Sequence, residues 1–419
     1  MFTLIFCIAL LIMIGTRLWL SSRQIRHVLQ HRAAVPGEFA DRIQLDAHQK
    51  AADYTAAKVR LSMIEVVVGA VLLVVLTLLG GIHAINVALT GWLGHGYVRD
   101  LALFASIGVI SGLVDMPFGL YRQFVLEERF GFNKMTIGLF FTDLIKSTLI
   151  GAVIGLPVAL AALWLMESAG TYWWLYTWLG WMAFNLLMLV LYPTVIAPLF
   201  NKFEPLADQS LKTRIENLLT RCGFAAKGLF VMDGSRRSAH GNAYFTGFGA
   251  AKRIVFFDTL IERLSPTEIE AVLAHELGHF KHKHVVKRIV LIFALSFIGL
   301  ALLGFLKTQT WFFTDLGVMP AMNDNNNALA LLLFFMIMPV FTFFLRPISA
   351  RTSRKQEFEA DAFAASKTNA NDLISALVKL YQDNASTLTP DPVHSAFYDS
   401  HPPASVRIGH LKSLTIQHA

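Results

Sequence analysis

Long apolar runs separated by polar stretches dominate the chain. Seven of them lie at residues 2–20, 61–83, 101–121, 137–166, 171–200, 289–306 and 328–345. Each is close to the length of about 20 residues that crosses a bilayer as a helix. Nothing basic precedes the first run, and Arg17 comes at its end, so it does not resemble a cleavable signal. The pattern predicts a mainly α-helical protein with seven transmembrane helices.

The composition agrees with a membrane protein. Of the 419 residues, 55% are hydrophobic and only 16% are charged, which is too apolar for a typical soluble domain. The two cysteines, Cys7 in the first run and Cys222 in a polar stretch, do not indicate a disulfide framework. The net charge of +7 could indicate nucleic-acid binding, but the Lys and Arg residues gather in alternate loops between the runs. We therefore expect a lipid bilayer as a partner and no nucleic acid.

The alternation of basic loops predicts the orientation. The loops after the first, third and fifth runs are rich in Lys and Arg, whereas the other three contain at most one. Basic loops stay in the cytoplasm. The chain then divides into helices 1–5 (1–200), a polar segment (201–288), helices 6 and 7 (289–345) and a tail (346–419), with the segment and the tail both cytoplasmic.

The polar segment 201–288 has a mixed pattern. Residues 208–219 read as an amphipathic helix, while 228–233 and 253–258 read as short strands bounded by turn residues. Ser265, a proline at the next position and Glu268 form a capping box that starts a helix. That helix is predicted to continue through residues 275–279.

Residues 275–279 have the sequence HELGH, an HExxH motif. His275 and His279 stand four residues apart on one helix face, so both imidazoles can bind one zinc ion. Glu276 lies beside the metal and can act as a general base that takes a proton from the attacking water and returns it to the leaving amine. A motif this short also occurs by chance, but the capped helix supplies the register that the spacing requires.

A catalytic zinc ion needs a third protein ligand. The metzincin pattern would require glycine at 282 and histidine at 285, where this chain has His282 and Val285. We therefore expect His282 and His284 to be surface residues near the membrane.

The tail offers an alternative source of ligands. Glu357 and Asp361 share one face of a predicted helix, whereas Glu359 points away from that face. We expect Glu357 to be the third ligand and Asp361 to accept a hydrogen bond from a zinc-binding histidine. The competing interpretation is a solvated, charged helix end.

Four charged residues fall within the apolar runs: Glu65, Asp115, Asp143 and Lys146. Such charges are costly in a bilayer unless they face a polar interior or pair with each other. A water-filled chamber and helix-to-helix pairing, for instance of Asp143 with Lys146, both remain open.

At this point the sequence resembles a known family, the type I CAAX prenyl proteases, which are membrane-integral zinc endopeptidases with seven transmembrane helices. The similarity extends over nearly the whole chain. It rests on Val35–Phe39, Glu128–Asn133, Tyr192–Thr194, Ala197–Asn201, Asn242–Phe245, the HELGH helix, Glu357–Phe363 and Ser400–Pro403.

The resemblance implies a gluzincin-type site in which His275, His279 and Glu357 hold one zinc ion and Glu276 is the base. It also implies that this site faces a chamber enclosed by the membrane helices.

Further roles follow only from the resemblance. Asn242, Ala243 and Tyr244 correspond to the family's strand that pairs with the substrate backbone. His401 and Arg407 correspond to residues that stabilise the tetrahedral oxyanion, although His401, which precedes two prolines, could equally be a turn residue.

The family removes a carboxy-terminal tripeptide from prenylated CAAX proteins, so the expected substrate is a peptide or protein, with or without a prenyl group. The last residues, 415–419, carry no eukaryotic retention signal, which favours the bacterial inner membrane over the endoplasmic reticulum. Prenylated proteins can be absent there, and a membrane-protein quality-control protease is the alternative. The oligomeric state is left open.

Two other classes of membrane protein fit the sequence less well. A transporter with an incidental HExxH would show interrupted helices in two repeats, and no such repeat is visible in the sequence. A protease that cleaves within the membrane would have its motif inside an apolar run, whereas here the motif precedes the polar stretch 281–284.

Overall fold

The computed structural model describes residues 1–224, 228–246, 253–321 and 324–417. Within this part of the chain, seven helical segments are long and apolar enough to cross a membrane. They are Phe2–Gln30 (α1), Leu45–Leu76 (α2), Tyr97–Glu127, Ile137–Ser168 (α5), Gly170–Leu199, His284–Leu306 (α10) and Asn327–Lys367. The segment Tyr97–Glu127 consists of α4 (Tyr97–Tyr121) and η2, and the segment Gly170–Leu199 contains α6 (Trp173–Leu191). The segment Asn327–Lys367 consists of α12 (Asn327–Thr342), η8 and α13 (Arg346–Lys367). The prediction of seven membrane helices is confirmed.

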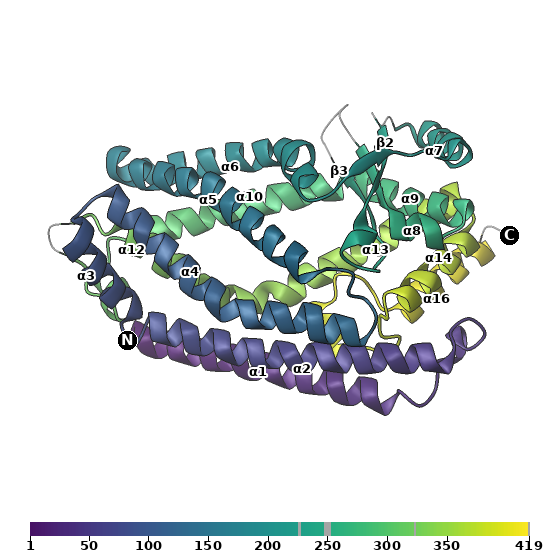
Figure 1. The fold of residues 1–419 in the computed structure, drawn as a ribbon, viewed down its shortest axis with the longest axis horizontal. Coiled ribbons are helices and arrows are strands. Elements are labelled where there is room, and N and C mark those ends of the chain that lie inside the picture. Colours follow the sequence, from purple (N-terminus) through teal and green to yellow (C-terminus); the bar gives the residue numbers. More distant parts are fainter. Residues whose placement is uncertain (225–227, 247–252, 322–323, 418–419) are drawn as a thin grey trace.

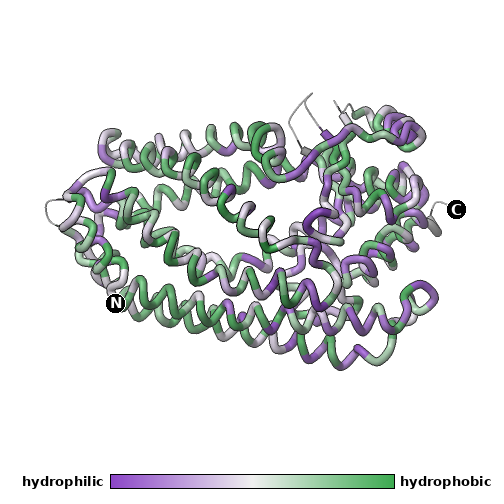
Figure 2. The backbone as a smooth tube through the Cα atoms, viewed as in Figure 1, coloured by the Kyte–Doolittle hydropathy of each residue, from purple (hydrophilic) through white to green (hydrophobic). Residues whose placement is uncertain are grey.

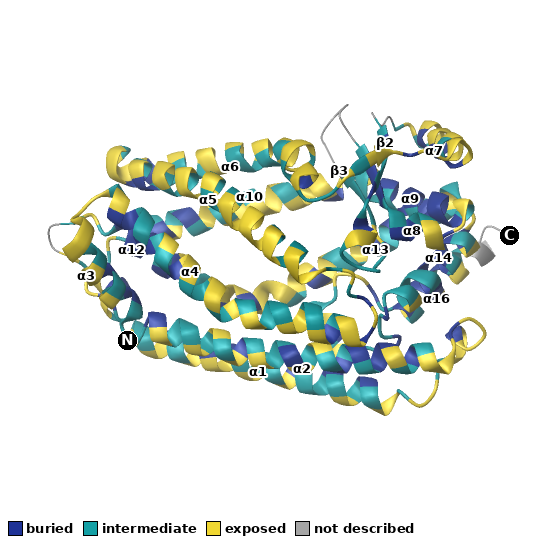
Figure 3. Ribbon diagram, viewed as in Figure 1, coloured by how far each residue is buried: buried dark blue, intermediate teal, exposed yellow. Residues whose placement is uncertain are grey.

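Many apolar side chains of these helices are not covered by other parts of the protein. Exposed residues follow most of the length of α5, α6 and α10 (Figure 3). Val153 on α5 is 73% exposed and Ile298 on α10 is 62% exposed. Figure 2 shows that hydrophobic residues dominate the long helices, whereas hydrophilic residues gather at the end of the molecule where the C-terminus lies. Lipid is the environment that removes so much apolar surface from water.

The second predicted run, 61–83, extends too far. Helix α2 ends at Leu76, and a tight turn through Gly80 (φ 77°) leads into α3, Gly81–Leu93. The turn is so tight that a Cβ atom on Gly81 would lie 2.7 Å from the carbonyl oxygen of Val75. The apolar pattern did not reveal this turn because the residues on both sides of it are also hydrophobic.

At the end of the molecule where α2 turns into α3, a buried ionic cluster connects α4 to the segment before α12. The Arg99 guanidinium contacts Asp100 at 2.7 Å and Asp324 at 2.6 Å. Short helix α11, Thr310–Thr314, packs nearby in the same apolar cluster as α12.

A small four-stranded sheet lies at the opposite end, and the two strands predicted at 228–233 and 253–258 belong to it. Its strands are β1 (Phe203–Pro205), β2 (Gly228–Met232), β3 (Ala243–Thr246) and β4 (Arg253–Phe257). The order is β1-β2-β4-β3, with β2 and β4 parallel and the outer strands antiparallel to their neighbours. In the described sheet, β3 is therefore an edge strand.

Helices pack around the sheet (Figure 1) and complete the second core of the protein. They are α7 (Gln209–Cys222), α8 (Asp258–Arg263), α9 (Pro266–Lys281), α13, α14 (Ala370–Asp383) and α16 (Ala404–Gln417). Ile215, Phe256 and Leu277 are almost fully buried in this core. Helix α15 (Pro392–Tyr398) instead packs its aromatic residues Phe397 and Tyr398 against the core of the membrane helices. The amphipathic helix expected at 208–219 is α7, which Asp208 caps and which continues to Cys222.

Three of the four charged residues within the membrane runs contact partners outside their own helices. Asp143 on α5 accepts hydrogen bonds from Arg237 at 2.9 and 3.2 Å, and the ammonium group of Lys146 donates to the carbonyl of Leu199 at 3.0 Å. Glu65 pairs with Arg122. The suggested pairing of Asp143 with Lys146 is therefore wrong, because Arg237 connects α5 to the sheet-containing part instead.

Candidate active site

Helix α9 carries the HExxH motif, and its start is fixed as the sequence predicted. The Ser265 hydroxyl accepts a hydrogen bond from the Glu268 amide, while the Glu268 carboxylate accepts one from the Ser265 amide. Both bonds satisfy donors that a helix start would leave unpaired. The helix register places His275 and His279 on one face.

Helix α13 approaches this face very closely at Gly278. A Cβ atom built on Gly278 would lie only 2.8 Å from the Cα atom of Ala360. Because glycine has no side chain, the two backbones can approach here, and Glu357, one turn before Ala360, reaches both histidines.

Three side chains converge at this helix crossing. The Nε2 atoms of His275 and His279 lie 3.2 Å apart. Glu357 places Oε2 3.4 Å from His275 Nε2 and Oε1 3.4 Å from His279 Nε2. The Glu357 Oε2 atom is buried without a hydrogen bond. Two imidazole nitrogens and a carboxylate within reach of both fit a metal ion.

Asp361 supports His275 from the side opposite the proposed metal. Its Oδ1 atom lies 2.8 Å from His275 Nδ1, and its side chain is fully buried. Burial alone would lower the pKa of His275, but the hydrogen bonds to Asp361 and Glu357 raise this pKa to about 9. The carboxylates thus stabilise positive charge at this position, as a cation site requires.

Arg407 on α16 contacts both tail carboxylates. It donates to Asp361 from Nε at 2.9 Å and from Nη2 at 2.5 Å, and its Nη1 atom lies 3.3 Å from Glu357 Oε2. The residue is only 5% exposed. The guanidinium group therefore fixes the positions of the two carboxylates relative to each other.

His401 lies on the accessible side of the cluster. Its Nε2 atom is 3.5 Å from Glu357 Oε1, and its side chain is 60% exposed. The segment before it is held by Arg354, which donates to the carbonyls of Ser395, Ala396 and Asp399. No sequence pattern indicated this role for Arg354, because its partners are backbone atoms. Glu276, adjacent to His275, is partly exposed.

The expected substrate strand forms one border of the sheet. Asn242 immediately precedes β3 and accepts a hydrogen bond from the Phe257 amide at 3.0 Å, and Ala243 and Tyr244 are the first residues of β3. The rings of Phe245 and Phe280 are 5.1 Å apart, which connects β3 to the end of α9.

The expectation that His284 is a surface residue is wrong. His284 is only 2% exposed, its Nδ1 atom lies 2.9 Å from His279 Nδ1, and its Nε2 atom lies 2.9 Å from Glu359 Oε2. His282, in contrast, is exposed as expected. His284 follows His279 by five positions, and a continuous helix would point the two side chains in different directions. Lys283 has a left-handed conformation (φ 56°) that breaks the helix and turns His284 back.

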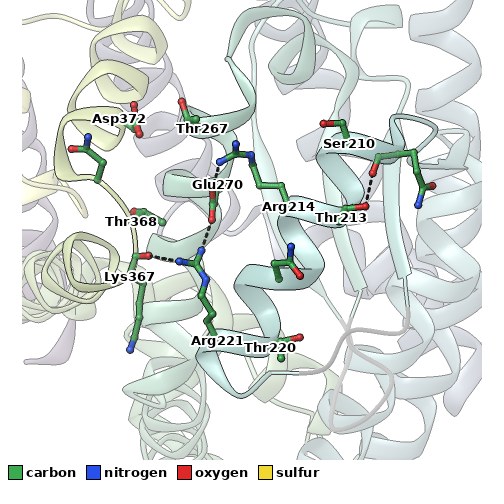
Figure 4. Close-up of a pocket in the computed structure, with 13 residues that line it drawn as sticks. Ser210, Thr213, Arg214, Thr220, Arg221, Thr267, Glu270, Lys367, Thr368 and Asp372 are labelled. Atoms are coloured by element: carbon green, nitrogen blue, oxygen red, sulfur yellow. Dashed lines mark hydrogen bonds and ion pairs between the residues drawn. The ribbon is translucent and has the colours of Figure 1, made fainter.

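A polar cavity of about 1130 Å³ lies between α7, α9 and the turn from α13 to α14. Figure 4 shows Arg214 and Arg221 both directed at Glu270, at 2.7 and 2.5 Å, with Arg221 also reaching the Lys367 carbonyl. The lining residues include none of the predicted site residues. These contacts connect α7 to α9 and do not form part of the histidine cluster.

Seven membrane helices, two histidines on an HExxH helix and a glutamate brought to them by α13 define a membrane-integral metallopeptidase. Models of two families match the chain: the CAAX prenyl protease N-terminal region with five membrane helices at residues 24–202, and peptidase family M48 at residues 205–415. The chain belongs to the CAAX prenyl protease family of M48 metallopeptidases.

Individual relatives agree with this assignment. A CAAX prenyl protease 1 homolog of Arabidopsis thaliana is 40% identical over 317 residues, which cover 74% of this chain and 73% of the relative. A CAAX prenyl protease 1 homolog of Caenorhabditis elegans is 32% identical over 427 residues, which cover 94% of this chain and 95% of the relative. The crystal structure of S. mikatae Ste24p matches with a TM-score of 0.91 at 30% identity and covers 98% of this chain and 99% of that one.

Proposed function

We propose that the protein is a zinc endopeptidase whose single zinc ion is held by His275, His279 and Glu357. The observation that carries this proposal is the convergence of three side chains: the Nε2 atoms of His275 and His279 lie 3.2 Å apart, and each lies 3.4 Å from one of the two Glu357 oxygens. In a tetrahedron with zinc–ligand distances of about 2.0–2.1 Å the ligand atoms lie about 3.3–3.4 Å apart. The two histidine nitrogens and one Glu357 oxygen are close enough to occupy three corners around one ion. The fourth corner is left for water or substrate.

Glu276 is the general base of the proposed reaction. Bound zinc supplies a Lewis acid for the attacking water and for the scissile carbonyl. The Glu276 carboxylate takes the proton of the water as the carbonyl carbon is attacked. The same carboxyl group then protonates the leaving amine nitrogen, so the peptide bond breaks without a covalent link to the enzyme.

His401 and the Arg407–Asp361 pair have different roles. The exposed His401 can donate a hydrogen bond to the oxyanion that develops on the attacked carbonyl. Arg407 is buried behind the carboxylates, and its contacts support a positioning role for Glu357 and Asp361. Asp361 in turn holds the Nδ1 proton of His275, so that Nε2 is free for the metal.

The edge strand β3 is the proposed substrate subsite. An extended peptide can pair with the backbone from Asn242 through Tyr244, a mode that gives affinity with little side-chain selectivity. The family name of the relatives supports a prenylated CAAX protein as the substrate. Peptides without a lipid, as a quality-control protease would cleave, are the second candidate class.

The site is proposed to face the cytoplasm and a chamber between the membrane helices. Lys and Arg residues concentrate in the loops on the side of the metallopeptidase region, in agreement with the positive-inside rule. The membrane is the bacterial inner membrane or, in a eukaryotic cell, that of the endoplasmic reticulum.

The Glu276→Gln variant tests the proposal. The purified variant should retain about one zinc ion per chain, because Glu276 is not a ligand, and should lose peptide cleavage. Glu262→Gln on the exposed face of α8 is the matched control and should cleave normally. Normal cleavage by Glu276→Gln would remove the assigned base. Prenylated and unprenylated peptides of one sequence, compared with the wild-type protein, then distinguish the two substrate classes.

A further inference from the structure

His279, one of the proposed zinc ligands, has a neighbour that none of the roles above uses. His284 is buried beside it, and Glu359 on α13 lies beyond His284. The three side chains form a continuous hydrogen-bond chain with both contacts at 2.9 Å. A buried histidine that contacts a metal ligand and a carboxylate at these distances is placed to orient that ligand.

The protons of this hydrogen-bond chain can be arranged in only one way if His279 binds a metal. His279 directs Nε2 toward His275 and Glu357, so this nitrogen must carry the free lone pair. Its proton is then on Nδ1 and can be donated only to an unprotonated His284 Nδ1. His284 is consequently neutral with its proton on Nε2, which it donates to the Glu359 carboxylate.

We infer that His284 and Glu359 are positioning residues for the metal site: they fix the ring orientation and the tautomer of His279. This inference rests on the proposed zinc site. His284 touches neither substrate nor metal, and it acts through His279 alone. Metal-binding histidines commonly donate their second nitrogen to a carboxylate or carbonyl, and here an imidazole is inserted between the ligand and the carboxylate.

The two zinc histidines are therefore supported unequally. His275 contacts a carboxylate directly, and that carboxylate, Asp361, is fully buried and held by Arg407. The support of His279 ends instead at Glu359, whose side chain is 32% exposed. Removal of Glu359 should consequently disturb the site without unfolding the protein.

The test measures the zinc affinity of the metal-free, full-length protein in detergent. A chromogenic zinc chelator competes with the protein for the metal. His284→Ala should weaken zinc binding 10–100-fold, the usual effect of losing such a partner. His284→Asn should stay within about threefold of wild type, because the amide oxygen can occupy the position of Nδ1 and accept the His279 proton. A role in packing alone would not predict this rescue.

Glu359→Ala provides an independent test, because this side chain is partly exposed. It should weaken zinc binding by about tenfold, at the lower end of the same range. Two controls should leave the affinity unchanged: His282→Ala, whose ring stacks on His284 but is exposed, and Lys355→Ala, which removes only the 3.9 Å ion pair to Glu359.

Wild-type zinc affinity in His284→Ala, with thermal unfolding unchanged, would overturn the inference. If His284→Ala does not fold, wild-type affinity in Glu359→Ala overturns it equally. His275→Ala and Glu357→Ala separate this failure from that of the proposed function. Both should abolish stoichiometric zinc, and if they do not, the zinc site itself is assigned wrongly.

Discussion

Gly278 on α9 and Ala360 on α13 are in contact at the point where the two helices cross. A Cβ atom at position 278 would lie 2.8 Å from Ala360 Cα and 3.1 Å from its carbonyl oxygen. These are backbone atoms that cannot rotate away. The glycine within the HExxH motif therefore sets the distance between the helix that carries the histidines and the helix that carries the glutamate.

Gly278→Ala should lower both stability and zinc content. Alanine is the better helix former by about 1 kcal/mol, but the clash with α13 is expected to cost more, about 1–3 kcal/mol from overpacking, and to move Glu357 away from the histidines. Thermal unfolding and metal analysis measure the two effects. Gly409→Ala on α16 is the control: its added Cβ meets nothing within 4 Å, so it should be neutral or stabilising. Full zinc content in Gly278→Ala would contradict this explanation.

Arg407→Ala should destabilise the fold by about 3–5 kcal/mol, as expected when one partner of a buried ion pair is removed. The variant leaves Asp361 and Glu357 buried without their common counter-charge. Denaturant unfolding of the purified protein measures the loss. Arg351→Ala, an exposed change on α13, should stay near wild type. Equal stabilities of the two variants would show that the buried contacts of Arg407 contribute little.

His401→Ala should reduce kcat by about 10²–10³, the range found when an oxyanion donor is removed. Its zinc content should remain at about one per chain, because His401 lies outside the three proposed ligands. The rate and the metal content should be measured on the same preparation. Ser400→Ala, which removes the 2.9 Å partner of His401 Nδ1, should have a much smaller effect. A loss of zinc in His401→Ala would instead place this residue among the ligands.

The contribution of Glu268 to stability should depend on pH. Burial by itself would raise the pKa of Glu268, but hydrogen bonds from Lys379, Ser375 and the Ser265 amide lower it below its usual value. A carboxylate whose pKa is lower in the folded chain stabilises the fold fully above its unfolded-chain pKa of about 4.3 and loses this effect as the pH falls through the folded pKa.

The Glu268→Gln variant isolates this charge, because glutamine can still complete the capping box. At pH 7 the metal-free wild type should have a higher Tm than the variant, and the difference should shrink as the pH falls below about 4.3. Lys379→Met should show the same pH dependence, since it removes the partner at 2.7 Å. A difference that stays constant between pH 7 and 3 would contradict the shifted pKa.

Local features of the chain were predictable from the sequence because their causes are local. A run of about 20 apolar residues has one favourable environment, the bilayer, and one conformation that satisfies its backbone there. The Ser265 capping box and the four-residue spacing of His275 and His279 are likewise contained in one short helix. The strands at 228–233 and 253–258 were visible from their β-branched and aromatic residues and the turns around them.

The predicted ends of elements were less accurate where neighbouring segments had the same composition. Helix α2 stops at Leu76 within an apolar run, because the fold turns there and not because the hydropathy changes. Asp143 had a plausible neighbour in Lys146 on its own helix, yet its partner is the distant Arg237. A charge selects the partner that the tertiary fold brings within reach, and no sequence pattern fixes that distance.

By itself, the sequence determined the membrane helices, the HExxH helix and the face on which its two histidines lie. The tertiary structure alone decided that α13 approaches within backbone contact of Gly278, which brings Glu357 to the histidines. It also decided that the left-handed Lys283 turns His284 inward against His279. Both outcomes depend on packing between segments that are separate in the chain, and packing is a property of the whole fold.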